Sequence, residues 1–112
     1  MDILNRVATS LFKRGFYNWC EGNQAEISAQ VFATMEELAE VARPMRRWIN
    51  TGNPPPDQML EEAADVWIAC TDLLLTICGN PVEAVKQVEN KLAKDELRGY
   101  LHKGGPLRGA LK

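Results

Sequence analysis

The chain has 112 residues and a formal net charge of −2, with a sequence pI of about 5.4. This length suits one domain, and the slight acidity argues against a dedicated nucleic-acid binder, which would carry a basic surface. A chain this short buries only about two-thirds of the surface that it exposes when unfolded. We therefore expect a single domain over residues 1–112 that gains further burial as a homo-oligomer.

Apolar residues recur at the 3.6-residue spacing of amphipathic helices along most of the chain. The Pro-rich stretch 50–56 and the triplet 79–81 separate the helical segments, and Pro81 suits the first turn of a helix. The sequence therefore predicts an all-α bundle of four to five helices without strands. The expected helices cover residues 2–19, 24–48, 57–78 and 81–97.

The helical spacing also predicts which faces are buried, and Pro44 is expected to kink or end the second helix. The basic, glycine-rich tail 99–112 is expected to be loose in isolation. The residues expected to face inward are Ile3, Val7, Leu11, Phe12, Ile27, Val31, Leu38, Val41, Met45, Trp48, Met59, Ala63, Val66, Cys70, Leu73, Ile77, Val85, Val88 and Leu92.

The cysteines and the N-terminus indicate the compartment. Cys20, Cys70 and Cys78 include no CxxC pair, and an odd count without regular spacing favours a reducing environment. Asp2 and the early mixture of charges do not resemble a signal peptide. The longest apolar run, residues 73–78, is far shorter than the ~20 residues of a membrane span. We expect a cytoplasmic protein with no membrane partner.

Four acidic residues form two pairs on consecutive predicted helices, Glu37 with Glu40 and Glu62 with Asp65. Each pair has i, i+3 spacing, which places the two Cβ atoms about 5–6 Å apart on one face. On a helical wheel, each acid pair lies beside the apolar stripe of its own helix, and on the same side of that stripe in both helices. The two helices therefore have the same arrangement of acidic and apolar faces. If these helices pack antiparallel, the four carboxylates meet at the border of the core.

Carboxylates held close together repel one another unless protons or cations neutralise them. Hard divalent cations with oxygen ligands, Mg²⁺ above all, supply that neutralisation in proteins. The matched pairs therefore predict a magnesium site. A solvated acidic surface is the alternative, and two matched pairs on consecutive helices make it the less favoured one.

The acidic pattern resembles that of the MazG-like family of all-α nucleoside triphosphate pyrophosphohydrolases. The family pattern is EExxE, a gap, and then ExxD, and this chain has EELAE at residues 36–40 and EAAD at residues 62–65. Family members often carry a Lys, an Asn and an Arg on the last helix, followed by a basic, Gly-rich end. At those places this chain has Lys91, Asp95 and Arg98, followed by His102-Lys103-Gly104-Gly105.

The resemblance implies a hydrolase that uses Mg²⁺, with Mn²⁺ as a possible substitute, to cleave a (d)NTP between the α- and β-phosphates. The products would be a (d)NMP and pyrophosphate. It also implies that Glu37, Glu40, Glu62 and Asp65 ligate the metal, in a homodimer or homotetramer whose helices complete each site. Glu36 is either an extra ligand or base that orients the attacking water, or a solvated neighbour.

Lys91 and Arg98 are the candidate phosphate contacts. The alternative is a basic helix end that complements the helix dipole. Asp95 departs from the family pattern, because an ionised carboxylate cannot donate a hydrogen bond to phosphate. Either Asn90 takes that role or the ligand is bound differently.

Trp19 and Trp48 are candidates for stacking on the base, although packing in the core or at an interface is the favoured interpretation. Asp72, two turns beyond Asp65, could support the site, bind the metal or be simply exposed.

Two other functions remain open at this point. One is a phosphoribosyl-ATP pyrophosphohydrolase, which belongs to the same all-α superfamily. The other is a non-catalytic helical interaction module, in which the acids form surface salt bridges with Arg43, Arg46 and Arg47.

Overall fold

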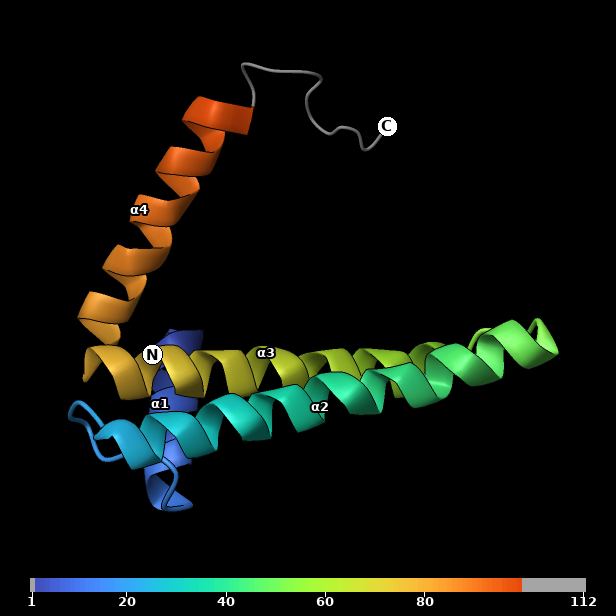
Figure 1. Ribbon diagram of the computed structural model, residues 1–112, viewed down its shortest axis with the longest axis horizontal. Helices are drawn as coiled ribbons and strands as arrows, with labels where there is room; N and C mark the ends of the chain where they lie inside the picture. Colours follow the sequence, from blue (N-terminus) through green and yellow to red (C-terminus); the bar gives the residue numbers. More distant parts are fainter. Residues whose placement is uncertain (1, 100–112) are drawn as a thin grey trace. The chain divides into compact units, whose positions relative to one another are not determined.

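The fold was analysed in a computed structural model that describes residues 2–99. Every regular element in that range is an α-helix, so the predicted all-α class is confirmed (Figure 1). The predicted loose tail beyond residue 99, with His102, lies outside the described residues. The helices are α1 (Ile3–Lys13), α2 (Gln24–Thr51), α3 (Pro56–Cys78) and α4 (Pro81–Gly99).

The chain divides into two compact units, residues 1–81 and residues 82–112. The first unit contains α1, α2 and α3, and the described part of the second is the remainder of α4. The expectation of one domain over residues 1–112 stays a prediction.

Local capping explains most of the helix ends. Asn23 and Glu26 form a reciprocal capping box at the start of α2, in which each side chain accepts a hydrogen bond from the other residue's backbone N–H. Gly52 and Gly79 end α2 and α3 in the left-handed conformation that glycine adopts without strain. Pro44 neither ends nor divides α2, which continues to Thr51.

The first helix is shorter than predicted, because α1 ends at Lys13 and Trp19 lies in the following loop. Gly15 has a φ of 83° and turns the chain away from the helix. Trp19 also has a positive φ, 59°, which is rare for a bulky residue. Its ring lies 5.2 Å from the ring of Tyr17 and 6.2 Å from that of Phe12, so aromatic packing helps to hold this conformation.

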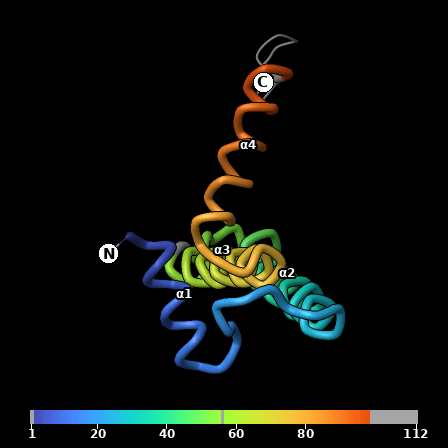
Figure 2. The backbone as a smooth tube through the Cα atoms, turned by 90° about the vertical axis from the view of Figure 1, so that its left-hand side faces the viewer, coloured from blue at the N-terminus to red at the C-terminus, as the bar shows by residue number. Residues whose placement is uncertain are grey.

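Helices α2 and α3 lie side by side and antiparallel, because only a short turn joins them (Figure 1). Seen along this pair, α3 lies between α1 and α2 (Figure 2). The loop 14–22 is tied to the end of α3 by two hydrogen bonds. Tyr17 Oη donates to the Gly79 carbonyl at 2.8 Å, and the Gly22 N–H donates to the Thr76 carbonyl at 2.7 Å.

The buried core of the described residues is small and centres on α1 and the second half of α3. All of the residues predicted to face inward on α2, α3 and α4 are exposed or half-buried, and the prediction is wrong for the exposed ones. The physical reason is that α2 has one neighbouring helix, which covers only part of its apolar stripe. The predicted inward residues that are exposed are Ile3, Phe12, Val31, Leu38, Met45, Trp48, Ala63, Cys70, Ile77, Val85, Val88 and Leu92.

The helices within residues 2–99 differ in length and apolar content. No single helix among residues 2–99 is long and apolar enough to cross a membrane. By length and composition alone, α3 and α4 taken together as a bent pair would be sufficient.

The hydrogen bond from Tyr17 to Gly79 is buried, so its removal should be measurable. We expect Tyr17→Phe to lower the free energy of unfolding by about 1–2 kcal/mol, because the Gly79 carbonyl loses a partner away from water. Urea denaturation measures this change.

The matched control is Thr71→Val, because the Thr71 hydroxyl bonds only to a carbonyl of its own helix. It should change stability by less than about 0.5 kcal/mol. Equal stability of Tyr17→Phe and the wild type would contradict the proposed anchoring of the loop.

Candidate metal centre

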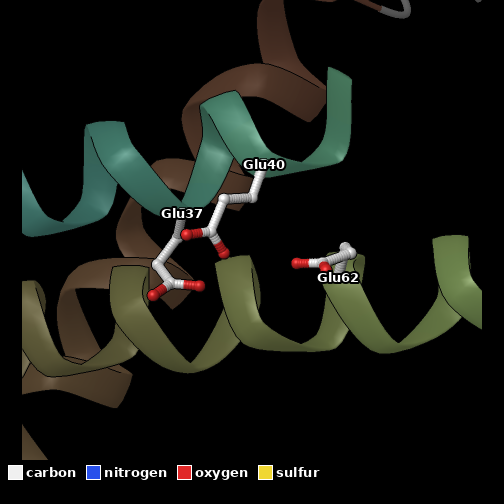
Figure 3. Close-up of side chains that lie close together, drawn as sticks. All are labelled: Glu37, Glu40 and Glu62. Carbon is white, nitrogen blue, oxygen red and sulfur yellow. The ribbon is translucent and has the colours of Figure 1, made fainter. Parts of the chain in front are cut away.

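Three of the four paired acids converge where α2 and α3 pack together. Glu37 and Glu40 on α2 and Glu62 on α3 point toward one another (Figure 3). One carboxylate oxygen from each residue lies within 4.8 Å of the others. Opposite oxygens bound to one Mg²⁺ are roughly 4 Å apart, so small side-chain rotations bring these three onto a common cation. We call Glu37, Glu40 and Glu62 the acidic cluster.

A buried oxygen within the acidic cluster has no hydrogen-bond partner among residues 2–99. This atom is Glu62 Oε1, on a side chain that is otherwise half-buried. A buried carboxylate oxygen without a partner is costly and is uncommon in folded proteins. A cation that bound this oxygen would satisfy it, and three converging carboxylates are a donor set that fits a hard divalent metal ion.

Two further acids outside the acidic cluster influence the pKa of Glu37. Partial burial raises the pKa of Glu37, and the negative charges of Glu40, Asp65, Glu62 and Glu36 raise it further, in decreasing order. Asp65 and Glu36 are both exposed and lie outside the acidic cluster itself. The charge of Asp65 therefore acts on Glu37, although the predicted metal ligand Asp65 does not belong to the acidic cluster.

A hollow of about 270 Å³ opens beside the acidic cluster, in the space between α2, α3 and the loop after α1. Glu37 and Asp65 lie on its wall, so the hollow and the acidic cluster share a side chain. We call it the Asp72 hollow. Its polar and aromatic lining consists of Arg14, Phe16, Gln30, Glu37, Asp65 and Asp72.

Asp72 is a buried acid that the sequence analysis left unassigned. Only 3% of the residue is exposed, and the Thr76 hydroxyl donates to its Oδ1 at 3.2 Å. Burial raises the pKa of Asp72, while the Thr76 hydrogen bond and the charge of Arg14 oppose that rise. The sequence contained a signal for this burial, because Asp72 is followed directly by the apolar residues Leu73, Leu74 and Leu75.

The aromatic residue that lines the Asp72 hollow is Phe16, and neither Trp19 nor Trp48 does so. The side chain of Phe16 is largely exposed, and the Arg14 guanidinium carbon lies 5.5 Å from its ring centroid. The sequence analysis missed Phe16 because it extended the first helix through this residue. Gly15, at the point where the chain turns, was the available signal.

The predicted phosphate contacts lie on α4, in the second unit, and they pair with Asp95. Lys91 Nζ is 2.9 Å and Arg98 Nη2 is 3.1 Å from Asp95 Oδ1. The hydrogen bond from Lys91 is the main cause of the lowered pKa of Asp95. Asp95 thus organises the two cations that the sequence singled out.

The arginines that follow the first acid pair do not neutralise it. Among residues 2–99, Arg43, Arg46 and Arg47 form no ion pair with the acidic cluster. Arg47 instead donates to Gln58 Oε1 at 2.7 Å. The surface salt bridges expected for a non-catalytic module are therefore not formed within the described residues.

Comparison of the chain with protein-family models, curated proteins and solved structures finds no match. The function is accordingly inferred from the residues and their arrangement.

The raised pKa of Glu37 predicts a stability effect with a defined sign. The native state disfavours ionised Glu37, so its ionisation destabilises the protein as pH rises through this raised pKa. Without metal at pH 7.5, we expect Glu37→Gln to be more stable than the wild type by about 0.5–1 kcal/mol, allowing for solvent screening.

The gain should disappear in acid, where the wild-type carboxyl is protonated. Urea melts at several pH values, with and without Mg²⁺, measure both effects, and Mg²⁺ should stabilise the wild type more than the variant. The control is Glu89→Gln, an exposed acid on α4. A gain that persists at low pH would show that charge repulsion is not the cause.

Proposed function

We propose that the protein is a Mg²⁺-dependent nucleotide pyrophosphohydrolase that resembles MazG-like enzymes and cleaves a (d)NTP to a (d)NMP and pyrophosphate. The observation that carries this proposal is the convergence of Glu37, Glu40 and Glu62 from two helices, together with a buried Glu62 oxygen that has no hydrogen-bond partner among the described residues. The EExxE and ExxD spacing of these residues supports the same reaction class. A hollow beside the acidic cluster provides space for part of a nucleotide.

The side chains have separate roles in this proposal. Glu37, Glu40 and Glu62 hold the metal, and Asp65 completes the oxygen ligands. The bound metal would neutralise charge on the polyphosphate and make a coordinated water more acidic. In this proposal Glu36, an exposed residue next to Glu37 in the sequence, accepts a proton from the attacking water.

The exposed apolar surface of the first unit supports the proposal of a homodimer or homotetramer. Leu38 and Leu60 are 60% and 69% exposed, and Trp67 is also largely exposed. An apolar surface of this kind becomes favourable when another subunit covers it. In the proposed assembly, a second copy of the chain covers this surface.

Pyrophosphate release tests the proposed reaction directly. With Mg²⁺ and a panel of NTPs, dNTPs and phosphoribosyl-ATP, we expect the wild type to release pyrophosphate. Glu62→Gln should reduce kcat/KM at least about 100-fold, because it removes a charged ligand while keeping the shape of the side chain.

The matched control is Glu61→Gln, which changes an exposed acid one residue away. It should retain most of the activity. The absence of turnover of any nucleotide, together with unchanged stability on adding Mg²⁺, would contradict the enzyme and favour a helical interaction module. Turnover of phosphoribosyl-ATP alone would assign the related biosynthetic activity.

The role of the basic residues on α4 has its own test. If Lys91 and Arg98 bind substrate phosphates, Lys91→Met and Arg98→Met should each raise KM about tenfold, because each removes a charge-assisted hydrogen bond. Steady-state kinetics measures this effect. Lys94→Met, a change of an exposed lysine on the same helix, is the control. An unchanged KM in the first two variants would leave these residues as partners of Asp95 only.

A further inference from the structure

The Asp72 hollow connects the acidic cluster to Asp72, a buried carboxylate outside that cluster. Glu37 belongs to the cluster and also lines the hollow, and Asp65 stands beside it. Asp72 lies in the same lining and is almost completely buried. A nucleotide whose phosphates reach the acidic cluster would therefore direct its remaining part toward Asp72.

The size and walls of the hollow fit a nucleobase. Its volume of about 270 Å³ is below the roughly 300–1,000 Å³ of pockets that enclose drug-sized ligands. Phe16 offers an exposed aromatic face, and Leu11 and Ile68 add apolar surface. Stacking of a base on an aromatic ring is favourable for every base, so these walls provide affinity without strong selection among bases.

Selection among bases depends on the polar groups of the hollow. An ionised carboxylate only accepts hydrogen bonds, and it has about four lone-pair positions. The Thr76 hydroxyl occupies one of these on Asp72 and fixes the orientation of the carboxylate. Arg14 lies on the same wall, and although burial raises the pKa of Asp72, the Thr76 hydrogen bond and the charge of Arg14 oppose that rise. Asp72 therefore presents acceptors to a ligand.

We propose that Asp72 selects nucleotides whose base carries an exocyclic amino group, as in cytosine, adenine and guanine, and disfavours uracil and thymine. This inference rests on the proposed function, because it assigns the base of the same substrate. An amino group donates to the Asp72 carboxylate, whereas the carbonyl at the corresponding place in uracil brings a second acceptor against it. Such mismatched polar groups in a desolvated site discriminate strongly between ligands.

The position of Asp72 also has a cost for the unliganded protein. A buried carboxylate with one neutral hydroxyl partner is less favourable than an isosteric amide at the same place. Residues that lower stability without serving the packing are characteristic of functional sites. Asp72→Asn should therefore keep the fold, since Asn Oδ1 can still accept from Thr76.

The test compares nucleotides that differ at one exocyclic group, CTP with UTP and GTP with ITP. Pyrophosphate release provides kcat/KM, and calorimetry with the α,β-methylene analogues of CTP and UTP, in Mg²⁺, provides binding without turnover. For the wild type we expect a preference of roughly 10- to 100-fold for the amino base, from a hydrogen bond to a charged acceptor. Asp72→Asn should remove most of this preference, because an amide can donate as well as accept.

Two control variants separate selection from general damage. Asp57→Asn changes an exposed acid at the start of the same helix and should leave the preference intact. Phe16→Leu should weaken binding of both analogues to a similar extent, because stacking does not depend on the exocyclic group.

The outcomes distinguish this inference from the proposed reaction. Equal use and equal binding of both members of each pair by the wild type would overturn the role of Asp72, even if pyrophosphate is released. A preference that survives unchanged in Asp72→Asn would overturn it as well. Preferential binding of the CTP analogue, lost in Asp72→Asn, would support it even if no nucleotide were hydrolysed, in which case the proposed reaction alone would fail.

Discussion

The site depends on the register in which α2 and α3 pack. Gln30 Nε2 on α2 donates to the Ala69 carbonyl on α3 at 3.1 Å, and the Thr34 hydroxyl, which donates to the Gln30 carbonyl at 2.8 Å, lies 3.3 Å from the same Ala69 carbonyl. Seven residues onward from Gln30 along α2 is Glu37, and seven residues back from Ala69 along the antiparallel α3 is Glu62. The same register that these contacts hold therefore sets the two acids opposite each other. A shift of one helical turn would separate them by about 5 Å along the helix axis.

The acids proposed to bind ligands between α2 and α3 are also residues that lower the stability of the unliganded protein. The pKa of Glu37 and that of Asp72 are both raised, mainly by burial, and Glu62 has an oxygen without a partner. Each of these acids lowers the stability of the unliganded chain relative to a neutral residue of the same shape. A cation at the acidic cluster and an amino group at Asp72 would relieve these costs. The same groups thus account for the proposed binding and for the predicted stabilising substitutions.

The small core explains why the apolar pattern of the sequence is only partly buried. Leu75, Tyr17 and Leu11 are fully or almost fully buried around α1 and the end of α3, whereas much of the apolar surface of α2 has no neighbour. The loop 14–22 compensates locally, since Tyr17 and Gly22 bind the last turn of α3 through hydrogen bonds. That loop also brings Phe16 and Arg14 to the hollow beside the acids.

The sequence alone determined the helical class, most helix ends and the matched acid pairs. These features depend on local chemistry, such as the capping box at Asn23, the left-handed glycines Gly52 and Gly79, and i, i+3 spacing. Only the tertiary structure decided that Asp65 does not belong to the acidic cluster, that Asp72 is buried, and that Phe16 lines the hollow. Those outcomes depend on the register of α2 against α3 and on a loop held by contacts between residues far apart in the chain. The periodicity of apolar residues describes one helix at a time. It therefore contains no information about the register between two helices or about the path of the loop.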